Sequence, residues 1–162
     1  MKLYSLFIGI SLVVCWQGCS KPGANENKTP VPVDYKVYTR YSYCGPESQS
    51  DTTFYYCTSS KTAFNSYFFF ILDHNDNPDT IPSVDFSTKK VVSIVKYGND
   101  FYILSVKGVS LLDKILEVEY SDSLIAQNMT WTISIPIIIT TSADFQMIRF
   151  IENGKNSQEI IP

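Results

Sequence analysis

The chain has 162 residues, of which 44% are hydrophobic and 18% charged, and its formal net charge is −3. This length fits one domain behind a short leader. The mild acidity and the presence of only two arginines, Arg40 and Arg149, exclude the basic stripe that nucleic-acid binding requires, so we expect no nucleic-acid partner.

The N-terminal segment has the layout of a cleaved export signal. Lys2 supplies a positive charge, and residues 3–14 form an apolar run that is too short to span a bilayer stably. The tetrapeptide WQGC, which ends at Cys19, resembles a relaxed bacterial lipobox. The resemblance implies that residues 1–18 are a lipoprotein signal peptide and that Cys19 carries a lipid anchor that includes palmitate. The alternative is a secreted protein without a lipid anchor.

A polar segment separates this leader from the rest of the chain. Residues 19–33 are rich in Lys, Pro, Gly, Asn and Thr and have no apolar period, which predicts a flexible tether. Residues 34–162 are then expected to form a single β domain. Ser20 is not the aspartate that retains enteric lipoproteins on the inner membrane, so the outer membrane is the expected location, on its periplasmic side or at the cell surface.

The sequence pattern of this domain predicts about eight to nine β-strands and little or no helix. Residues 116–120 and 131–140 alternate apolar with polar side chains, as half-buried strands do. Further strands are expected at 34–43, 53–58, 63–72, 90–97, 101–107, 145–152 and 155–161. The pattern predicts an all-β fold, an antiparallel β-sandwich or a rolled-up small barrel.

Three short features qualify this pattern. The dipeptides at 98–99 and 153–154 tolerate positive φ, and each predicts a two-residue hairpin. Residues 121–127 are compatible with one helical turn. Pro136 has no N–H to donate, which predicts that its strand is an edge or bends there.

Cys44 and Cys57 flank a turn-rich stretch between two aromatic, strand-like segments. In an oxidising compartment a disulfide between them would close this hairpin and stabilise the fold by roughly 3 kcal/mol on the loop-entropy model. A metal or redox pair is the alternative, but the chain has no CxxC spacing and no second ligand pair.

Residues 73–79, with the sequence DHNDNPD, hold the candidates for metal binding. Their oxygen-bearing side chains at alternate positions are Asp73, Asn75, Asn77 and Asp79. This alternation is typical of the start of a calcium loop, but Pro78 stands where such loops have glycine, and Val84 stands where they have a bidentate glutamate. An Asx-rich turn is therefore the favoured interpretation, and calcium is the only cofactor that the sequence raises.

His74 is the only histidine, so a Ser-His-Asp or Cys-His catalyst would have to use it. Multi-histidine zinc sites are excluded, and no Gly-rich phosphate loop occurs. We expect no catalytic residues and no enzymatic activity; a hydrolase that uses His74 with nearby carboxylates is the less favoured alternative.

Aromatic residues cluster in the first half of the domain. Pairing across strands within a sheet is their favoured interpretation. The alternative is an exposed platform for a sugar or a protein, because tyrosine combines apolar area with a polar tip. The candidate platform residues are Tyr38, Tyr41, Tyr43, Tyr55, Tyr56 and Tyr102.

Residues 84–151 resemble a known family. The order and spacing of VDFS from Val84, LEVEY from Leu116 and IRF from Ile148 are similar to the small domain of the PrcB-like protease-complex subunits. The resemblance implies a bacterial lipoprotein that stabilises a partner surface protease. The turn of that family matches here only at Gly98 and Tyr102.

These features predict a non-catalytic, membrane-anchored accessory or binding lipoprotein. Its β domain would dock a protein partner of the cell envelope through a sheet edge or an aromatic face. A glycan-binding surface lipoprotein that uses exposed tyrosines is the alternative function.

Overall fold

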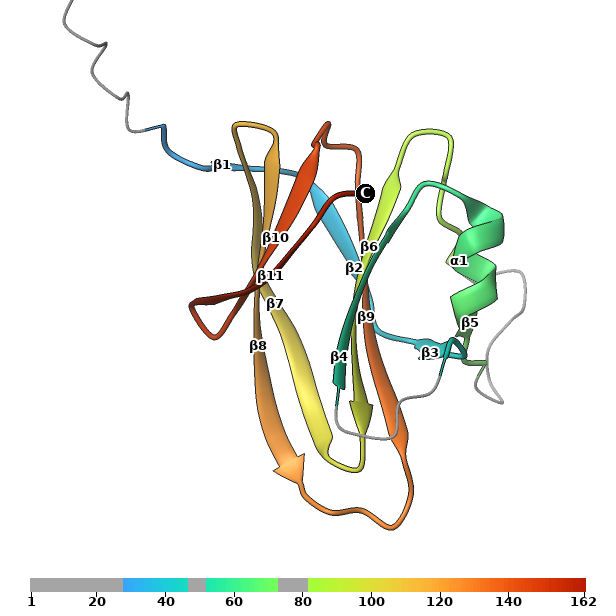
Figure 1. The fold of residues 1–162 in the computed structure, drawn as a ribbon. Helices are drawn as coiled ribbons and strands as arrows, with labels where there is room; N and C mark the ends of the chain where they lie inside the picture. The colour runs from blue at the N-terminus through green and yellow to red at the C-terminus, as the bar shows by residue number, and fades with distance from the viewer. Residues whose placement is uncertain (1–27, 47–51, 73–81) are drawn as a thin grey trace, which may run out of the picture.

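The computed structural model describes residues 28–46, 52–72 and 82–162, which form two packed β-sheets and a small third layer (Figure 1). The elements in chain order are β1 (Val31–Pro32), β2 (Tyr35–Tyr38), β3 (Tyr41–Tyr43), β4 (Thr52–Thr58), α1 (Lys61–Tyr67), β5 (Phe68–Phe70), β6 (Lys90–Gly98), β7 (Phe101–Leu112), β8 (Ile115–Ala126), β9 (Ile133–Thr141), β10 (Met147–Glu152) and β11 (Lys155–Ile160).

The strands are divided among three sheets. The first sheet has the order β1-β7-β8-β10-β11, the second has the order β2-β9-β6-β4, and β3 pairs with β5 in the third. Every pair is antiparallel except β8 with β10, which are parallel because the chain crosses to the second sheet through β9 between them. The predicted all-β sandwich is confirmed, with this one parallel pair in it.

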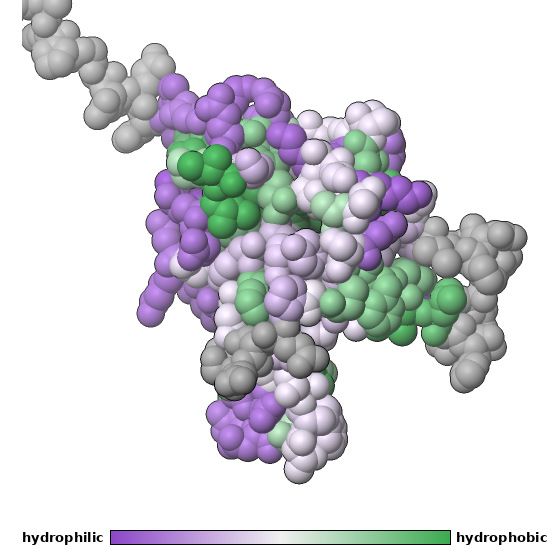
Figure 2. Space-filling model, turned by 45° about the vertical axis from the view of Figure 1, so that its right-hand side comes forward, coloured by the Kyte–Doolittle hydropathy of each residue, from purple (hydrophilic) through white to green (hydrophobic). Residues whose placement is uncertain are grey.

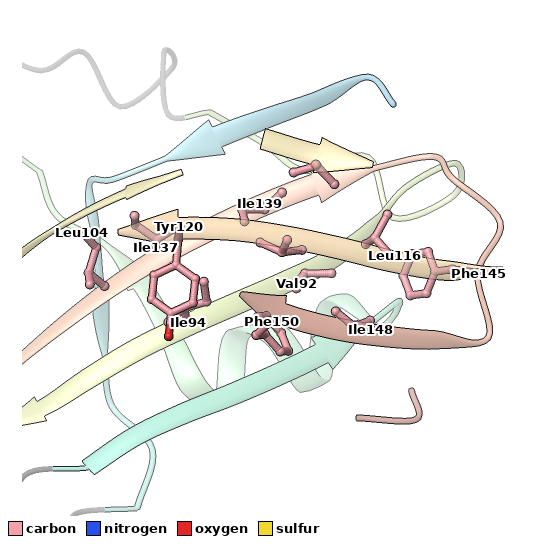
Figure 3. Packing of buried hydrophobic residues seen from close by; sticks show 12 residues of the cluster. Val92, Ile94, Leu104, Leu116, Tyr120, Ile137, Ile139, Phe145, Ile148 and Phe150 are labelled. Atoms are coloured by element: carbon pink, nitrogen blue, oxygen red, sulfur yellow. The ribbon is translucent and has the colours of Figure 1, made fainter. Parts of the chain in front are cut away.

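The main core lies between the first two sheets. The alternation predicted for residues 116–120 is confirmed, because Leu116, Val118 and Tyr120 are fully buried while Glu119 is exposed on the other face. Figure 3 shows the side chains of Leu116 and Tyr120 in the same space as the labelled side chains of β6, β9 and β10. Period-two alternation thus places one face of β8 in the core.

A second core covers the outer face of the second sheet. There α1, β3 and β5 pack over β6 and β9, as the right-hand side of Figure 1 shows. As a result residues 91–95 and 137–141 are buried at every position. Strands covered on both faces have continuous apolar runs rather than alternation, which explains the sequences VVSIV and IIITT.

The strand predicted at 63–72 is wrong over its first half, where α1 forms. Ser60 caps this helix, since its hydroxyl accepts a hydrogen bond from the Ala63 N–H at 3.3 Å. Phe64 is the buried residue of the helix, and the aromatic run that follows returns to a strand beside β3. The Ser60 cap and the burial of Phe64 among neighbouring aromatic rings outweigh the β preference of the aromatic residues.

The two predicted hairpins have different outcomes. At 153–154 the prediction is confirmed: Asn153 and Gly154 have φ of 50° and 78°, and they join β10 to β11 in a two-residue turn. At 98–99 it is wrong, because the chain passes there from β6 in one sheet to β7 in the other. A two-residue turn that was not predicted joins β7 to β8 through Asp113 and Lys114, both with positive φ.

Strands β8 and β9 decide two further predictions, the helical turn at 121–127 and the place of Pro136. The helical turn proposed for residues 121–127 is wrong, since β8 continues to Ala126 in register with β7. Pro136 lies inside the second sheet, paired with Val95, but β2 pairs only with residues 138–141 of β9. The proline therefore lies in the half of β9 that has a single neighbouring strand, as its missing N–H requires.

We predict that truncating Phe150 destabilises the fold strongly. Its ring is fully buried between the sheets and lies 4.4 Å from the ring of Tyr55. Phe150→Ala should lower the free energy of unfolding by about 3–5 kcal/mol in urea denaturation. The matched control Phe69→Ala removes an exposed ring and should change it by less than about 0.5 kcal/mol; equal losses would contradict the two-sheet core.

Candidate functional site

The first three candidate platform tyrosines are core residues. Tyr38, Tyr41 and Tyr43 are each more than 90% buried, so the prediction that they form an exposed surface is wrong. The Tyr41 ring lies 5.4 Å from the ring of Phe64, and Tyr43 stacks on Phe54 at 5.9 Å. They fill the space under the third layer, which is the aromatic packing that the sequence favoured.

The next two tyrosines are half-buried and point to opposite faces of β4. The Tyr55 hydroxyl pairs with that of Tyr120 at 2.8 Å in the main core, and the Tyr56 hydroxyl pairs with that of Tyr43 at 2.6 Å in the second core. Burial, followed by these hydrogen bonds, raises the pKa of both Tyr56 and Tyr120. The hydroxyls of Tyr55 and Tyr56 are therefore both used inside the fold.

Tyr102, the sixth candidate, lies beside a charged cluster between the two sheets. The Lys96 ammonium is 5.1 Å from the centre of the Tyr102 ring. Its Nζ is 2.9 Å from an Asp122 oxygen and 2.6 Å from a Glu152 oxygen, and these three side chains come from β6, β8 and β10. The Asn153 amide donates a further hydrogen bond of 2.6 Å to Asp122.

Interactions within this cluster stabilise the ionised forms of Lys96 and Asp122. Burial alone would raise the pKa of Asp122, but hydrogen bonds from Lys96 and Asn153 outweigh it, so the pKa is lowered. Burial would likewise lower the pKa of Lys96, and its two carboxylate partners raise it instead. A glycosidase acid needs a raised pKa. The cluster therefore works as an ionic clamp between the sheets and supplies no general acid through Asp122.

The predicted disulfide is absent, and both cysteines are free thiols. Cys44 and Cys57 do not lie in one hairpin, because β3 pairs with β5 whereas β4 pairs with β6. The exposed Cys44 thiol instead points at the Ser66 carbonyl, 3.7 Å away. Burial raises the pKa of the Cys57 thiol to about 11, which makes it a weak nucleophile.

Several predicted site residues fall outside the described part of the chain. They are Cys19, His74, Asp73, Asn75, Asn77 and Asp79. Among the residues that the structure does describe, no three His, Cys, Asp or Glu side chains come together as a metal site. No helix in that part is long and apolar enough to cross a bilayer.

The end of the sandwich formed by the lower halves of β7 and β8 is the most unusual surface. We call residues 101–106 and 121–132 the distal arm; it lies at the bottom of Figure 1, where the molecule narrows in Figure 2. Large apolar side chains of the arm are exposed to solvent. They are Phe101, Ile103, Leu124, Ile125 and Trp131, of which Trp131 is 59% exposed. Sequence reasoning placed Phe101, Ile103 and Trp131 in strands and left Leu124 and Ile125 in a possible helical turn. Neither pattern reveals which segments lack a covering layer.

The pairing of the strands explains this exposure. On one side of the arm, β1 pairs only with Ser110 and Leu111 of β7. On the other side, β10 pairs with β8 only as far as Tyr120. Within the described residues the arm is therefore a two-stranded ribbon without a strand on either side. Such edges present backbone groups and apolar side chains to a partner.

A second apolar surface lies on the third layer. Phe69, Ile71 and Leu72 are exposed beside β5, and Figure 2 shows hydrophobic surface on this side of the molecule. Next to it α1, β5 and residues 82–86 enclose a cleft of about 400 Å³. This surface borders residues 73–81, which are outside the described part of the chain.

Comparison with known proteins adds no relative. No family model, no curated protein and no solved structure matches the chain. The functional argument therefore depends on the geometry of this molecule.

We predict that the ionic clamp makes stability depend on pH through Asp122. A carboxyl whose pKa is lowered by folding contributes fully above its unfolded-state pKa of about 3.9 and loses its contribution as the pH falls through the folded value. Asp122→Asn should therefore cost roughly 1–3 kcal/mol at pH 7, and the difference from the native chain should shrink below about pH 4.

Urea denaturation at several pH values measures this difference. Asp34→Asn, which changes an exposed carboxylate on the link between β1 and β2, is the matched control and should show a difference below about 0.5 kcal/mol. A loss for Asp122→Asn that stays constant down to pH 2 would contradict the clamp.

Proposed function

We propose that this protein is a non-catalytic accessory lipoprotein, anchored through a lipid on Cys19, whose β domain docks a protein partner of the cell envelope. The observation that carries the proposal is the distal arm, with its exposed apolar side chains and open strand edges. Large apolar side chains that stay exposed on a ribbon without neighbouring strands are typical of a surface that contacts a protein or a membrane.

The outer face of the rest of the first sheet carries paired charges, whereas the arm exposes apolar side chains. Above it the outer face of β8, β10 and β11 is polar, where Arg149 bridges Glu117 and Glu159 with both distances 2.7 Å. That face is solvated and ionic, as a surface without a binding role is expected to be. The change from paired charges to exposed apolar side chains occurs where β10 ends.

The position of the arm fits a tethered protein. β1 enters the domain at the upper end of the sandwich, whereas the arm lies at the lower end (Figure 1). A chain held to a membrane through residues that precede β1 would direct the arm away from the lipid surface. The apolar arm is then placed to meet a protein partner rather than the bilayer that holds the anchor.

Docking of a protein is better supported than binding of a glycan. The glycan alternative relied on exposed tyrosines, and Tyr38, Tyr41 and Tyr43 are buried. The resemblance of residues 84–151 to PrcB-like subunits would make the partner a surface protease, and this assignment stays a prediction. The proposal of an outer-membrane location likewise follows from the leader sequence alone.

We predict that Cys19 alone determines membrane association. The native chain should fractionate with membranes, require detergent for release and yield an N-terminal peptide that begins with acylated Cys19, because two or more acyl chains give firm anchoring. Cys19→Ala should leave the protein in the soluble fraction or uncleaved at residue 18. The matched control Cys15→Ala should behave as the native chain; an unacylated product that begins at Met1 would contradict the anchor.

We predict that the arm contacts a specific protein in intact cells. A photo-reactive phenylalanine analogue at Trp131 or at Ile125 should give one discrete protein adduct on illumination, identified by mass spectrometry. The matched control places the analogue at Ile161, an apolar residue that is 82% exposed and lies outside the arm. Equal adducts from all three positions, or none from the arm, would contradict docking through this surface.

A further inference from the structure

The segment that leads into the domain lies along the edge of β7, at the upper end of the sandwich in Figure 1. We call residues 28–33 the strap; they contain β1. At its C-terminal end the Val33 N–H donates to the Val109 carbonyl at 3.1 Å. At its N-terminal end the Lys28 ammonium lies 2.6 Å from a carboxylate oxygen of Asp113, in the turn between β7 and β8. The strap is thus held to the domain at both ends.

The order of prolines and valines in the strap fits a strand that is bound on one side only. Successive backbone N–H groups of a strand point alternately toward one neighbour and away from it. Because the Val33 N–H points at β7, the Val31 N–H does so too. Pro30 and Pro32 then occupy the positions that face away, where a missing N–H costs no ladder bond. Proline also reduces the conformational freedom that docking must remove.

We propose that the strap sets the length of the membrane tether and the corner of the domain from which the tether leaves. The proposal rests on the lipid anchor proposed at Cys19. With the strap docked, residues 19–27 form the tether, and a chain of this length spans at most about 32 Å. With the strap released, residues 19–33 would span at most about 54 Å. Docking therefore keeps the upper end of the sandwich, opposite the distal arm, near the lipid (Figure 1).

The backbone ladder with β7 contributes most of this docking. The side chains of Lys28 and Asp113 are both more than half exposed, and an exposed ion pair stabilises a structure little. Val33 is half-buried against the main core, so a change there would also alter core packing. The Val31 side chain is 63% exposed, so its contribution comes through the backbone. Val31 is therefore the position at which docking can be changed without disturbing the core.

Trypsin cleavage after Lys28 measures docking of the strap without any membrane. It is the first bond of the mature chain that trypsin should cut, because Lys21 is followed by Pro22. The purified, lipid-bearing chain in detergent is compared with a free peptide of residues 22–36. Docking should slow cleavage at least about fivefold relative to the peptide, because the protease needs the strap to open.

Two variants separate the backbone ladder from other causes of protection. Val31→Pro removes the N–H that faces β7, so its cleavage rate should come within about twofold of that of its own matched peptide. Pro32→Ala, the matched control, changes a residue whose nitrogen faces away and should stay protected. Neutron reflectometry on a supported bilayer of phosphatidylethanolamine and phosphatidylglycerol then measures the gap between the headgroups and the domain. Val31→Pro should widen this gap by about 5 Å, as expected for a longer flexible chain, and Pro32→Ala should not.

The outcomes separate failure of the strap from failure of the anchor. Both substituted residues are exposed, so matching thermal unfolding curves should show that the variants fold. Native cleavage as fast as that of the peptide overturns the strap, and so does protection that Val31→Pro leaves intact or that increases with protein concentration, since the latter places the segment on a second copy. An unchanged gap overturns its control of the tether. A protected chain that does not bind the bilayer shows instead that the lipid anchor is wrong.

Discussion

The fold depends on one constraint, the burial of the second sheet on both faces. Strands β6 and β9 lie between the main core and the aromatic third layer, and every side chain from Val91 to Val95 is buried. Both strands are held by packing on both faces, and ladder bonds run along both edges of β6 and of residues 138–141 of β9. The first sheet has only one covered face, so its stability depends on how much of its length lies over the second. The arm is the part of β7 and β8 that has no further described strand beside it in its own sheet.

The ionic clamp marks the boundary between the supported and the unsupported parts. Lys96 points inward from β6 at the level where the apolar core gives way, and it draws together Asp122 and Glu152 from two strands of the facing sheet. A partly buried ion pair contributes less to stability than apolar packing of the same volume, but it fixes which groups face each other. The clamp therefore sets the register between the sheets at the point where the exposed arm begins.

The sequence predicted the fold class well and the surface poorly, for one physical reason. Alternation in residues 116–120 and the turn at 153–154 are local signals, and both were confirmed. The hairpin at 98–99 and the disulfide between Cys44 and Cys57 depended on which strands pair, and such pairing is set by contacts distant in sequence. The alternative of an exposed tyrosine platform failed at Tyr38, Tyr41 and Tyr43 for the same reason. These side chains are buried in the second core, which a third layer formed partly by an unpredicted helix completes.

Exposure of the arm follows from the lengths of the flanking strands rather than from its own composition. If β1 continued alongside β7, or β10 alongside β8, Ile103 and Ile125 would lie beside covered strands in an ordinary sheet. Instead β1 has two residues, because the chain must cross at once to the second sheet to form β2. β10 turns back at Asn153, whose amide is bound to Asp122. The turn at Asn153 thus ends β10 beside Asp122 and leaves β8 without a second neighbouring strand beyond Tyr120 in the described part of the chain.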